Sequence, residues 1–178
     1  FRSILLPLVC ILQLILAMDL SASEGLSEYT LGSGDHIRIQ VYGEDDLTVE
    51  AQLSDAGTIS YPFLGELRLL GLTVGQLQKK VSDGLLGDYL IDPKVSVTIL
   101  EYRQFYINGE VKTPGGFPFK PGLTVRKAVS LAQGFTERAA RGNIFIISDS
   151  QATAVPRKVG LNEPVKPGDI ITIEQSFF

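Results

Sequence analysis

The single histidine and the clustered carboxylates are the side chains of this sequence best suited to metal chemistry. His36 follows Asp35, but the sequence has no second histidine, and its one cysteine is Cys10. Because protein zinc sites use three or four nitrogen, sulfur or carboxylate ligands, we interpret His36 as a residue at the start of a strand. The acidic run Glu44-Asp45-Asp46 lacks the further spaced oxygen ligands of a calcium loop and is typical of a solvated turn. The sequence therefore predicts neither a metal nor a cofactor.

Catalytic signatures are absent from the sequence. It contains no Gly-x-Ser-x-Gly elbow and no glycine-rich phosphate loop ending in Lys-Ser or Lys-Thr. Glycoside cleavage needs only two carboxylates at a suitable distance in space. Such carboxylates are available at Glu44, Asp46, Glu66, Glu101 and Glu110. A glycan hydrolase therefore stays an open alternative, although we expect that the protein is not an enzyme.

Tyrosines and a group of cations are the candidates for contact with a sugar or a charged partner. Aromatic rings in strands are more often core residues or cross-strand partners than ligand contacts; the tyrosines in question are Tyr42, Tyr61, Tyr89, Tyr102 and Tyr106. The cations Arg126, Arg138 and Arg141, with Lys127, could contact an anionic polymer or a neighbouring subunit, or could form a solvated helix face. The net charge of −4, with both signs interspersed, argues against nucleic-acid binding.

The first residues have the pattern of a secretory signal peptide. Arg2 supplies a positive charge, Ile4 to Met18 is a largely apolar run, and Ser21-Ala22-Ser23 offers small residues for cleavage. We expect a signal peptide over residues 1–23, with cleavage after Ser23, and hence a secreted protein. Cys10 could carry a lipid, but it stands inside the apolar run, and we interpret it as one more apolar residue of the leader.

Strand and turn signals dominate the first half of the mature chain. Alternating residues predict a strand over 37–42, and β-rich segments predict further strands over 49–54, 58–62 and 67–70. Asp55 and Gly57 form the turn before the third of these strands, since Asp can bond the nearby backbone and Gly can adopt positive φ. Gly65 separates the third strand from the fourth.

A helix signal follows. Gly71 ends the fourth strand, and Thr73 with Gln76 three residues later matches a capping box. The spacing predicts a helix over 74–86 whose apolar stripe comprises Val74, Leu77, Val81 and Leu85. The segment 94–102 then alternates as a clear strand. The helix is apolar on one side, so we expect it to cover a sheet made by the flanking strands.

The second half predicts a hairpin, a helix and further strands. A strand over 105–111 leads into a turn at Pro114-Gly115, and 117–119 returns as the second hairpin strand. After Gly122, a helix begins at Thr124 and ends at Gly134 as a C-cap glycine, and it buries Val125, Ala128, Val129 and Ala132. The segments 143–148 and 169–174 are the last predicted strands.

Two strand starts share one local pattern. Gly34-Asp35 precedes the first strand, and Gly168-Asp169 precedes the last. In each pair we expect the glycine to turn the chain and the aspartate to accept bonds from the backbone amides that follow it.

These elements predict an α+β fold with two small domains. The first, over residues 28–103, has paired strands, a helix and a strand. The second, over residues 104–176, is close to the ββαββ order of a β-grasp, or ubiquitin-like, domain. We place the boundary near Tyr102 to Gln104, without a flexible linker.

At this level of detail the sequence resembles the periplasmic polysaccharide export proteins of Gram-negative bacteria. The first domain matches their export domain at Tyr29 to Asp35, which includes Gly34, at Asp55-Ala56-Gly57, at Tyr61-Pro62-Phe63-Leu64-Gly65 and at Gly71-Leu72-Thr73. The second resembles their soluble-ligand-binding (SLBB) β-grasp domain at Gly109-Glu110-Val111, Pro114-Gly115, Gly122-Leu123-Thr124 and Gly134. Several ordered motifs in succession are more specific than one short motif.

The resemblance implies export of a capsular or extracellular polysaccharide, in the periplasm and in association with the outer membrane. It also implies a homo-oligomeric ring and an inner-membrane partner that controls chain length. No amphipathic helix follows the last strand before Phe178, so we expect a shorter ring that docks on a separate outer-membrane pore. The alternative is a monomeric periplasmic module that binds a small ligand or a protein.

Overall fold

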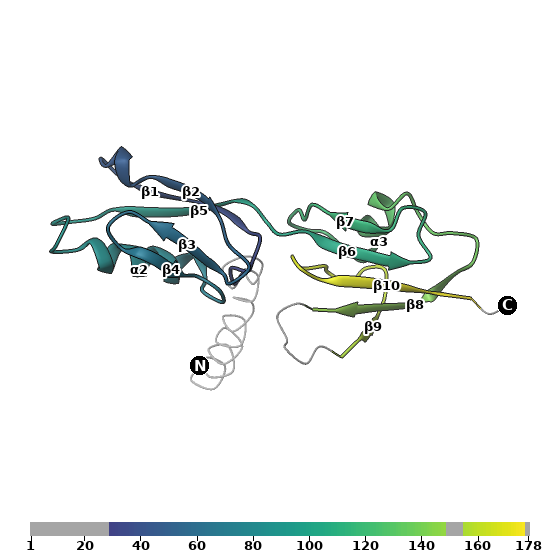
Figure 1. Cartoon of the computed structure of the whole chain (residues 1–178). Coiled ribbons are helices and arrows are strands. Elements are labelled where there is room, and N and C mark those ends of the chain that lie inside the picture. The colour runs from purple at the N-terminus through teal and green to yellow at the C-terminus, as the bar shows by residue number, and fades with distance from the viewer. Residues whose placement is uncertain (1–28, 149–154, 177–178) are drawn as a thin grey trace, which may run out of the picture.

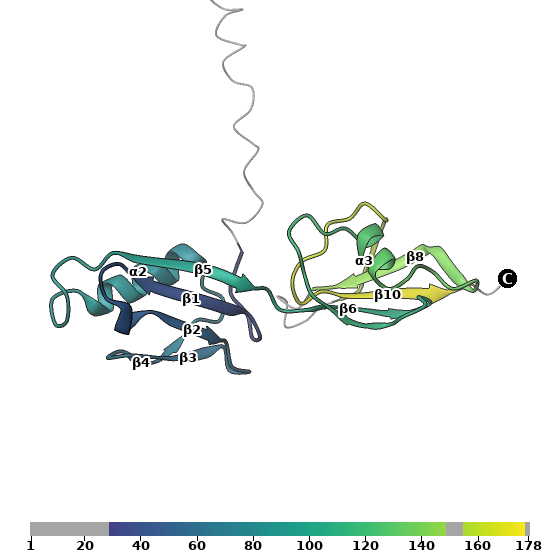
Figure 2. The same ribbon diagram turned by 90° about the horizontal axis from the view of Figure 1, so that it is seen from above.

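The computed structural model describes residues 29–148 and 155–176, which form two α+β units joined at the end of one strand (Figure 1). Each unit has its own hydrophobic core, and no residue belongs to both cores. We call residues 29–103 the first unit and residues 104–176 the second unit. The predicted α+β class is confirmed. Figure 2 shows the two units along one elongated body.

The first unit consists of a three-stranded sheet, a separate hairpin and one helix. Its elements are β1 (His36–Val41), the 3₁₀ helix η1 (Asp45–Leu47), β2 (Val49–Gln52), β3 (Thr58–Tyr61), β4 (Gly65–Arg68), α2 (Val74–Leu85) and β5 (Val95–Glu101). The sheet has the order β2-β1-β5 with antiparallel pairs, and β3 pairs with β4. Helix α2 buries Leu77, Val81 and Leu85, as its apolar stripe predicts.

The helix start confirms the predicted capping box. The amide of Gln76 donates to Thr73 Oγ1 at 3.2 Å, and the amide of Thr73 donates to Gln76 Oε1 at 2.9 Å. These bonds satisfy two of the backbone donors that every helix start leaves without an intrahelical partner.

The hairpin differs from its prediction at β4. This strand begins at Gly65 and ends at Arg68, so the predicted strand 67–70 was placed two residues too late. Gly65 adopts φ 71° and pairs directly with Tyr61. The amides of Leu69 and Leu70 both donate to the carbonyl of Gly57, and these bonds take the two leucines out of the ladder.

The second unit is a five-stranded mixed sheet with one helix. Its elements are β6 (Phe105–Gly109), β7 (Gly115–Phe117), α3 (Val125–Leu131), β8 (Ala139–Ile147), β9 (Arg157–Val159) and β10 (Ile170–Gln175), in the sheet order β7-β6-β10-β8-β9. The first and last strands, β6 and β10, are parallel neighbours at the centre. A hairpin, a helix and a return to the centre of the sheet fit the predicted ββαββ order. Helix α3 lies over the sheet and begins after Thr124, and the predicted residues Val125, Ala128, Val129 and Ala132 are buried.

Three predictions for the second unit need correction. Strand β8 begins four residues before the predicted start at 143, and β9 was not predicted. Gln133, with φ 62°, takes the left-handed position directly after the C-cap residue Ala132, and Gly134, which is also left-handed with φ 91°, follows it. The amides of Gln133 and Gly134 donate to the carbonyls of Ser130 and Val129. This bond pair is a Schellman motif that places Gly134 one position later than predicted.

The helices in the described part of the chain are short. Helix α2 has 12 residues and α3 has 7. Neither has the length and apolar content needed to cross a bilayer. The predicted signal peptide, its cleavage position Ser23 and Cys10 lie outside the described residues.

Candidate functional site at the junction of the two units

The junction is organised by Asp35, whose carboxylate is fully buried where the chain enters β1. Asp35 Oδ2 accepts hydrogen bonds from Tyr29 Oη at 2.6 Å, from the Gly32 amide at 2.8 Å and from Arg103 Nη1 at 3.3 Å. Asp35 Oδ1 accepts from the Arg103 amide at 2.8 Å. A buried carboxylate needs such partners to offset its lost hydration. Asp35 thereby fixes the segment that links β5 to β6.

The backbone amide that donates to Asp35 from its own turn lies on the other side of the residue from the amides that we predicted. The carboxylate accepts from the amide three residues before it, not from the amides that follow it. Asp169 repeats this geometry in the second unit, where its Oδ2 accepts from the Lys166 amide at 2.8 Å. Gly34 and Gly168 have φ of 89° and 84°, so the predicted glycine turns are confirmed.

Arg103 lies at the centre of the junction. Its side chain is 14% exposed, and its Nη1 also donates to Tyr29 Oη at 2.7 Å. The guanidinium packs over the Tyr29 ring, with Cζ 5.7 Å from the ring centroid. A Cβ at Gly32 would lie 2.2 Å from Arg103 Nη1, so a side chain at this position would displace the guanidinium from its present place.

Aromatic side chains continue the contact from the first unit into the second. Tyr102 meets Tyr29 edge-on at a centroid distance of 5.1 Å, and it meets Phe119 edge-on at 5.3 Å. Both geometries are favourable for aromatic pairs. Burial, followed by the hydrogen bond to Asp35, raises the pKa of Tyr29 far above its ordinary value. The Tyr29 hydroxyl therefore stays protonated and keeps donating to Asp35.

Asp169 is the second buried carboxylate, and it borders the same linking segment. Its carbonyl accepts from the Tyr106 amide at 2.8 Å, and the Gly168 amide donates to the carbonyl of Gln104 at 3.1 Å. Burial raises the pKa of Asp169, and the Lys166 amide, the Ser148 hydroxyl and the charges of Lys166 and Arg103 oppose that rise. Arg103 thus acts electrostatically on a carboxylate of each unit.

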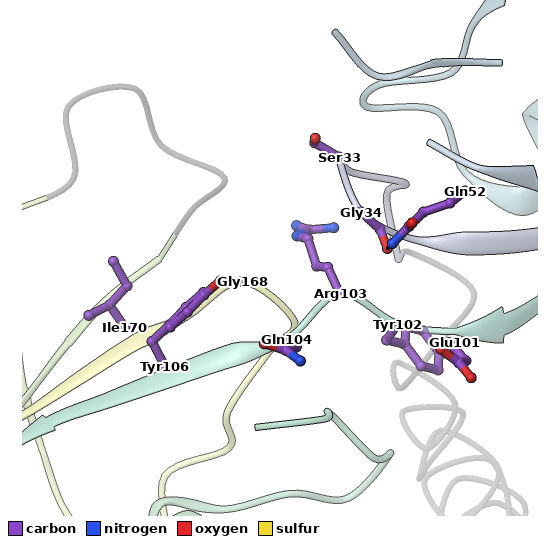
Figure 3. Close-up of a pocket in the computed structure, with 10 residues that line it drawn as sticks. All are labelled: Ser33, Gly34, Gln52, Glu101, Tyr102, Arg103, Gln104, Tyr106, Gly168 and Ile170. Carbon is purple, nitrogen blue, oxygen red and sulfur yellow. Dashed lines mark hydrogen bonds between the residues drawn. The ribbon is translucent and has the colours of Figure 1, made fainter. Parts of the chain in front are cut away.

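A pocket of about 420 Å³ opens at this junction (Figure 3). It is lined by Ser33, Gly34, Gln52, Glu101, Tyr102, Arg103, Gln104, Tyr106, Gly168 and Ile170. Figure 3 shows the Arg103 side chain between Ser33 and Gly34 on one side and Tyr106 with Ile170 on the other. Such a wall can bind a polar ligand through amide, hydroxyl and aromatic contacts. Among the described residues, no group of three or more His, Cys, Asp or Glu side chains could hold a metal.

Of the predicted export motif, only Gly34 lines the pocket, and Asp35 is buried next to it and bonds the lining residue Arg103. The other residues shape the turns and the core of the first unit: Asp55, Gly57, Tyr61, Pro62, Gly65, Gly71 and Thr73. Tyr61 is buried and its hydroxyl donates to the carbonyl of Leu47 at 2.9 Å. It is therefore a core residue rather than a sugar contact.

The predicted β-grasp residues also lie away from the pocket and determine backbone geometry. They are Gly109, Val111, Pro114, Gly115, Gly122, Thr124 and Gly134. Gly109 pairs with Ile173, and its φ is 82°. Thr124 caps α3, since its Oγ1 accepts from the Lys127 amide.

The structure does not bring the three predicted contact cations to the pocket. Arg126 donates to Asn162 Oδ1 at 3.2 Å, and Arg141 packs over the Phe135 ring at 5.5 Å. Arg138 is exposed, just before β8. Tyr102 and Tyr106, from the tyrosine group, do line the pocket.

Sequence reasoning missed the roles of Tyr29, Arg103 and Phe119. The available signal was the predicted boundary itself. A boundary without flexible residues needs side chains that hold it, and Arg103 stands in the middle of that segment.

Comparisons with known proteins agree with the two-unit arrangement. Residues 23–100 match the model of the polysaccharide biosynthesis/export protein family, and residues 104–160 match that of the SLBB domain. The chain is 35% identical over 156 residues to the exopolysaccharide production protein ExoF of Rhizobium meliloti (strain 1021), covering 76% of this chain and 36% of that relative. It is 24% identical over 181 residues to the EPS I polysaccharide export outer membrane protein EpsA of Ralstonia nicotianae (strain ATCC BAA-1114 / GMI1000), covering 83% of this chain and 47% of the relative. The chain spans less than half the length of these relatives.

Proposed function

Because the chain belongs to the polysaccharide export protein family, we propose that it is a non-enzymatic subunit of the apparatus that carries an extracellular or capsular polysaccharide across the outer membrane. One observation carries the proposal: the export and SLBB family models match in succession, and the first matched stretch contains the core of the first unit while the second contains most of the core of the second unit.

The junction supports a role in binding and assembly rather than catalysis. Glu101 is the one carboxylate among the residues that line the pocket. Glycoside hydrolysis commonly uses two carboxylates across the scissile bond. Arg103, Asp35 and Tyr29 are engaged in fixing the linking segment. Two modules that are bonded at their junction suit a subunit that must repeat identically in an assembly.

In this proposal the protein works in the periplasm at the outer membrane as a homo-oligomeric ring subunit. Its partners are the polysaccharide, an inner-membrane protein that controls chain length and a separate outer-membrane pore. The relative named as an outer membrane export protein supports a place in the cell envelope. Arg126, Arg138 and Arg141 are exposed and therefore available to a polymer or to a neighbouring subunit.

Deletion and complementation test the function. We expect a strain without the gene to lose polysaccharide from the medium and to regain it when the wild-type gene is restored. A matched strain that carries the Glu174→Gln variant, changed at an exposed residue of β10, should behave as wild type. An unchanged polysaccharide level after deletion would overturn the proposal.

The pocket favours one second candidate, a monomeric periplasmic module that binds a small ligand or a protein. Light scattering of the chain at several concentrations separates the two candidates. A discrete multiple of the subunit mass supports the ring, whereas a monomer at every concentration favours the binding module.

A further inference from the structure

The junction pocket has a flat apolar wall, which the second unit supplies. Tyr106 of β6 is 47% exposed, and its direct cross-strand partner on β10, Ile170, is 36% exposed. Both residues lie on the sheet face opposite the core, because their chain neighbours Phe105 and Ile171 are fully buried. The tyrosine ring and the isoleucine therefore present adjacent apolar surface to the pocket (Figure 3).

The strand on the other side of Tyr106 positions its ring. Gly116 of β7 pairs with Tyr106, and a Cβ built at Gly116 would lie 2.9 Å from Tyr106 Cε1. The ring therefore lies over a glycine backbone, and a side chain at that position would displace it. The same Cβ would lie 2.6 Å from Gln104 Oε1. One glycine thus makes room for two of the side chains that line the pocket.

The first unit supplies a polar wall. Gln52 of β2 and Glu101 of β5 are exposed, and both are cross-strand partners of His36 in β1. Their side chains therefore lie on one face of the sheet. Gln52 Nε2 donates to the Gly34 carbonyl at 3.0 Å, and this bond positions the amide at the pocket. Within residues 29–148 and 155–176, Glu101 has no salt-bridge partner, so its carboxylate can accept hydrogen bonds from a ligand.

The charges at the pocket favour an uncharged ligand. Arg103 is the one basic residue of the lining, and its Nη1 donates to Asp35 and to Tyr29 from a side chain that is 14% exposed. Glu101 adds an exposed negative charge. Like charges that face each other across an interface are unfavourable. An acidic ligand would therefore bind less well than a neutral ligand of the same shape.

The two walls match the two kinds of surface on a sugar ring. A pyranose with equatorial hydroxyls has flat C–H faces, which pack on an aromatic ring, and an edge of hydroxyls that donate and accept hydrogen bonds. Tyr106 and Ile170 offer the apolar contact. Glu101 and the amides of Gln52 and Gln104 offer the polar contacts, and a hydroxyl bonded to the carboxylate forms a strong, charge-assisted hydrogen bond. The pocket volume of about 420 Å³ falls within the range of about 300 to 1,000 Å³ that is usual for small-ligand sites.

We propose that the junction pocket binds uncharged sugar units of a polysaccharide chain. The C–H face of one unit packs on Tyr106, and hydroxyls bond to Glu101 and to the two glutamine amides. The inference rests on the proposed function, which supplies the polymer, and it names the class of sugar and the residues that contact it. Because the site has one aromatic platform and few polar groups, we expect weak binding with a Kd of about 1 mM. Weak binding suits a polymer that must move past the protein.

Saturation-transfer NMR on the full chain in mild detergent tests the site, because it observes the sugar whatever the size of the protein assembly. The probes are cellotetraose, which is uncharged and has equatorial hydroxyls, glucose, which is its single unit, and tetragalacturonate, which is acidic. We expect cellotetraose to bind with a Kd of about 1 mM and tetragalacturonate to bind about tenfold more weakly. Glucose should bind more weakly than cellotetraose, because one unit contacts only part of a lining that two protein units supply.

Four variants assign the contacts. Tyr106→Ala removes the aromatic platform and should weaken cellotetraose binding about tenfold, whereas Tyr106→Phe keeps the ring and should bind nearly as well as wild type. Tyr42→Ala removes an exposed tyrosine outside the pocket, so it is the matched control and should leave binding unchanged. Glu101→Gln removes the negative charge and should narrow the preference for cellotetraose over tetragalacturonate. Circular dichroism checks that each variant is folded.

Each result supports or overturns the proposed site. Cellotetraose that does not bind, or that binds equally well to wild type and to Tyr106→Ala, overturns the pocket as a sugar site. Tetragalacturonate that binds wild type more tightly than cellotetraose overturns the uncharged class. Glucose that binds as tightly as cellotetraose shows a site for a free sugar and overturns the polymer contact. The deletion experiment measures export independently, so the proposed function can fail while the sugar site stands, and the sugar site can fail while the proposed function stands.

Discussion

Among single residues, Asp35 has the most demanding environment. Its buried carboxylate accepts four hydrogen bonds, two of them from Arg103. We predict that Asp35→Ala lowers the free energy of unfolding by about 3 kcal/mol, because it leaves a largely buried guanidinium without its carboxylate. Urea unfolding measures this change. Glu50→Ala, which breaks an exposed pair with Arg38, is the matched control and should cost less than about 1 kcal/mol. Equal costs for both variants would contradict the central role of Asp35.

Asp169 should respond in the opposite way. Burial raises its pKa in the folded protein. The folded state therefore binds the proton more tightly than the unfolded state, and stability falls as pH rises from the ordinary carboxyl pKa through the raised one. Asp169→Asn removes this charge and keeps an acceptor for the Lys166 amide. We predict that the variant is as stable as wild type or more stable at pH 7, and that its stability depends less on pH between 4 and 7. A loss of stability at pH 7 like that of Asp35→Ala would contradict the assignment.

Residue patterns predicted the glycine turns better than they predicted the hydrogen-bond partners of side chains. The positive φ of Gly34, Gly57 and Gly168 follows from local turn chemistry, which a sequence displays. The bond between Asp35 and Arg103 joins residues 68 positions apart, and no local pattern encodes it. The direction of the aspartate bonds was wrong because a carboxylate at this turn can reach the amide three residues earlier, and only the backbone path decides between the two.

At the scale of elements, the parallel pair of β6 and β10 depends on one glycine. Gly109 adopts φ 82°, and a Cβ there would lie 2.1 Å from the carbonyl oxygen of Ile173. Gly43 has a similar φ of 83°, but a Cβ added there would meet no atom within 4 Å. We predict that Gly43→Ala costs about 1 kcal/mol, from backbone strain alone. Gly109→Ala should cost roughly 2 to 3 kcal/mol more, because β10 must also move. Thermal unfolding compares the two variants, and equal costs would show that the close contact is unimportant.

Element types followed from the sequence more reliably than element limits. The capping box and apolar stripe of α2 are local, and the structure confirms both. The limits of β4 and β8 depend on pairing partners that are distant in sequence, and these partners moved each start from its predicted place. Strand β9 was missed because its three residues, Arg157 to Val159, are too few to show alternation.

At the scale of the whole molecule, the two units are distinct in core and are joined through Arg103 and the ring chain Tyr29, Tyr102 and Phe119. The sequence predicted two units and their family, because motifs that occur in a fixed order can be recognised directly in the sequence. It did not predict the junction pocket, since only the fold brings its lining residues together. Of the candidate site, the sequence therefore predicted Gly34 and Asp35 as motif residues and Tyr102 and Tyr106 as possible sugar contacts, but not the role of Arg103.

The central claim is that the protein acts in export rather than in synthesis of the polymer, and the family description names both processes. The most direct measurement is a pulse of labelled sugar in a strain without the gene, followed by counting labelled polymer in the periplasm and in the medium. Our account predicts that labelled polymer fails to reach the medium and accumulates in the periplasm, and that wild-type complementation reverses this. A fall in the total amount of labelled polymer, with an unchanged share of it reaching the medium, would contradict our account.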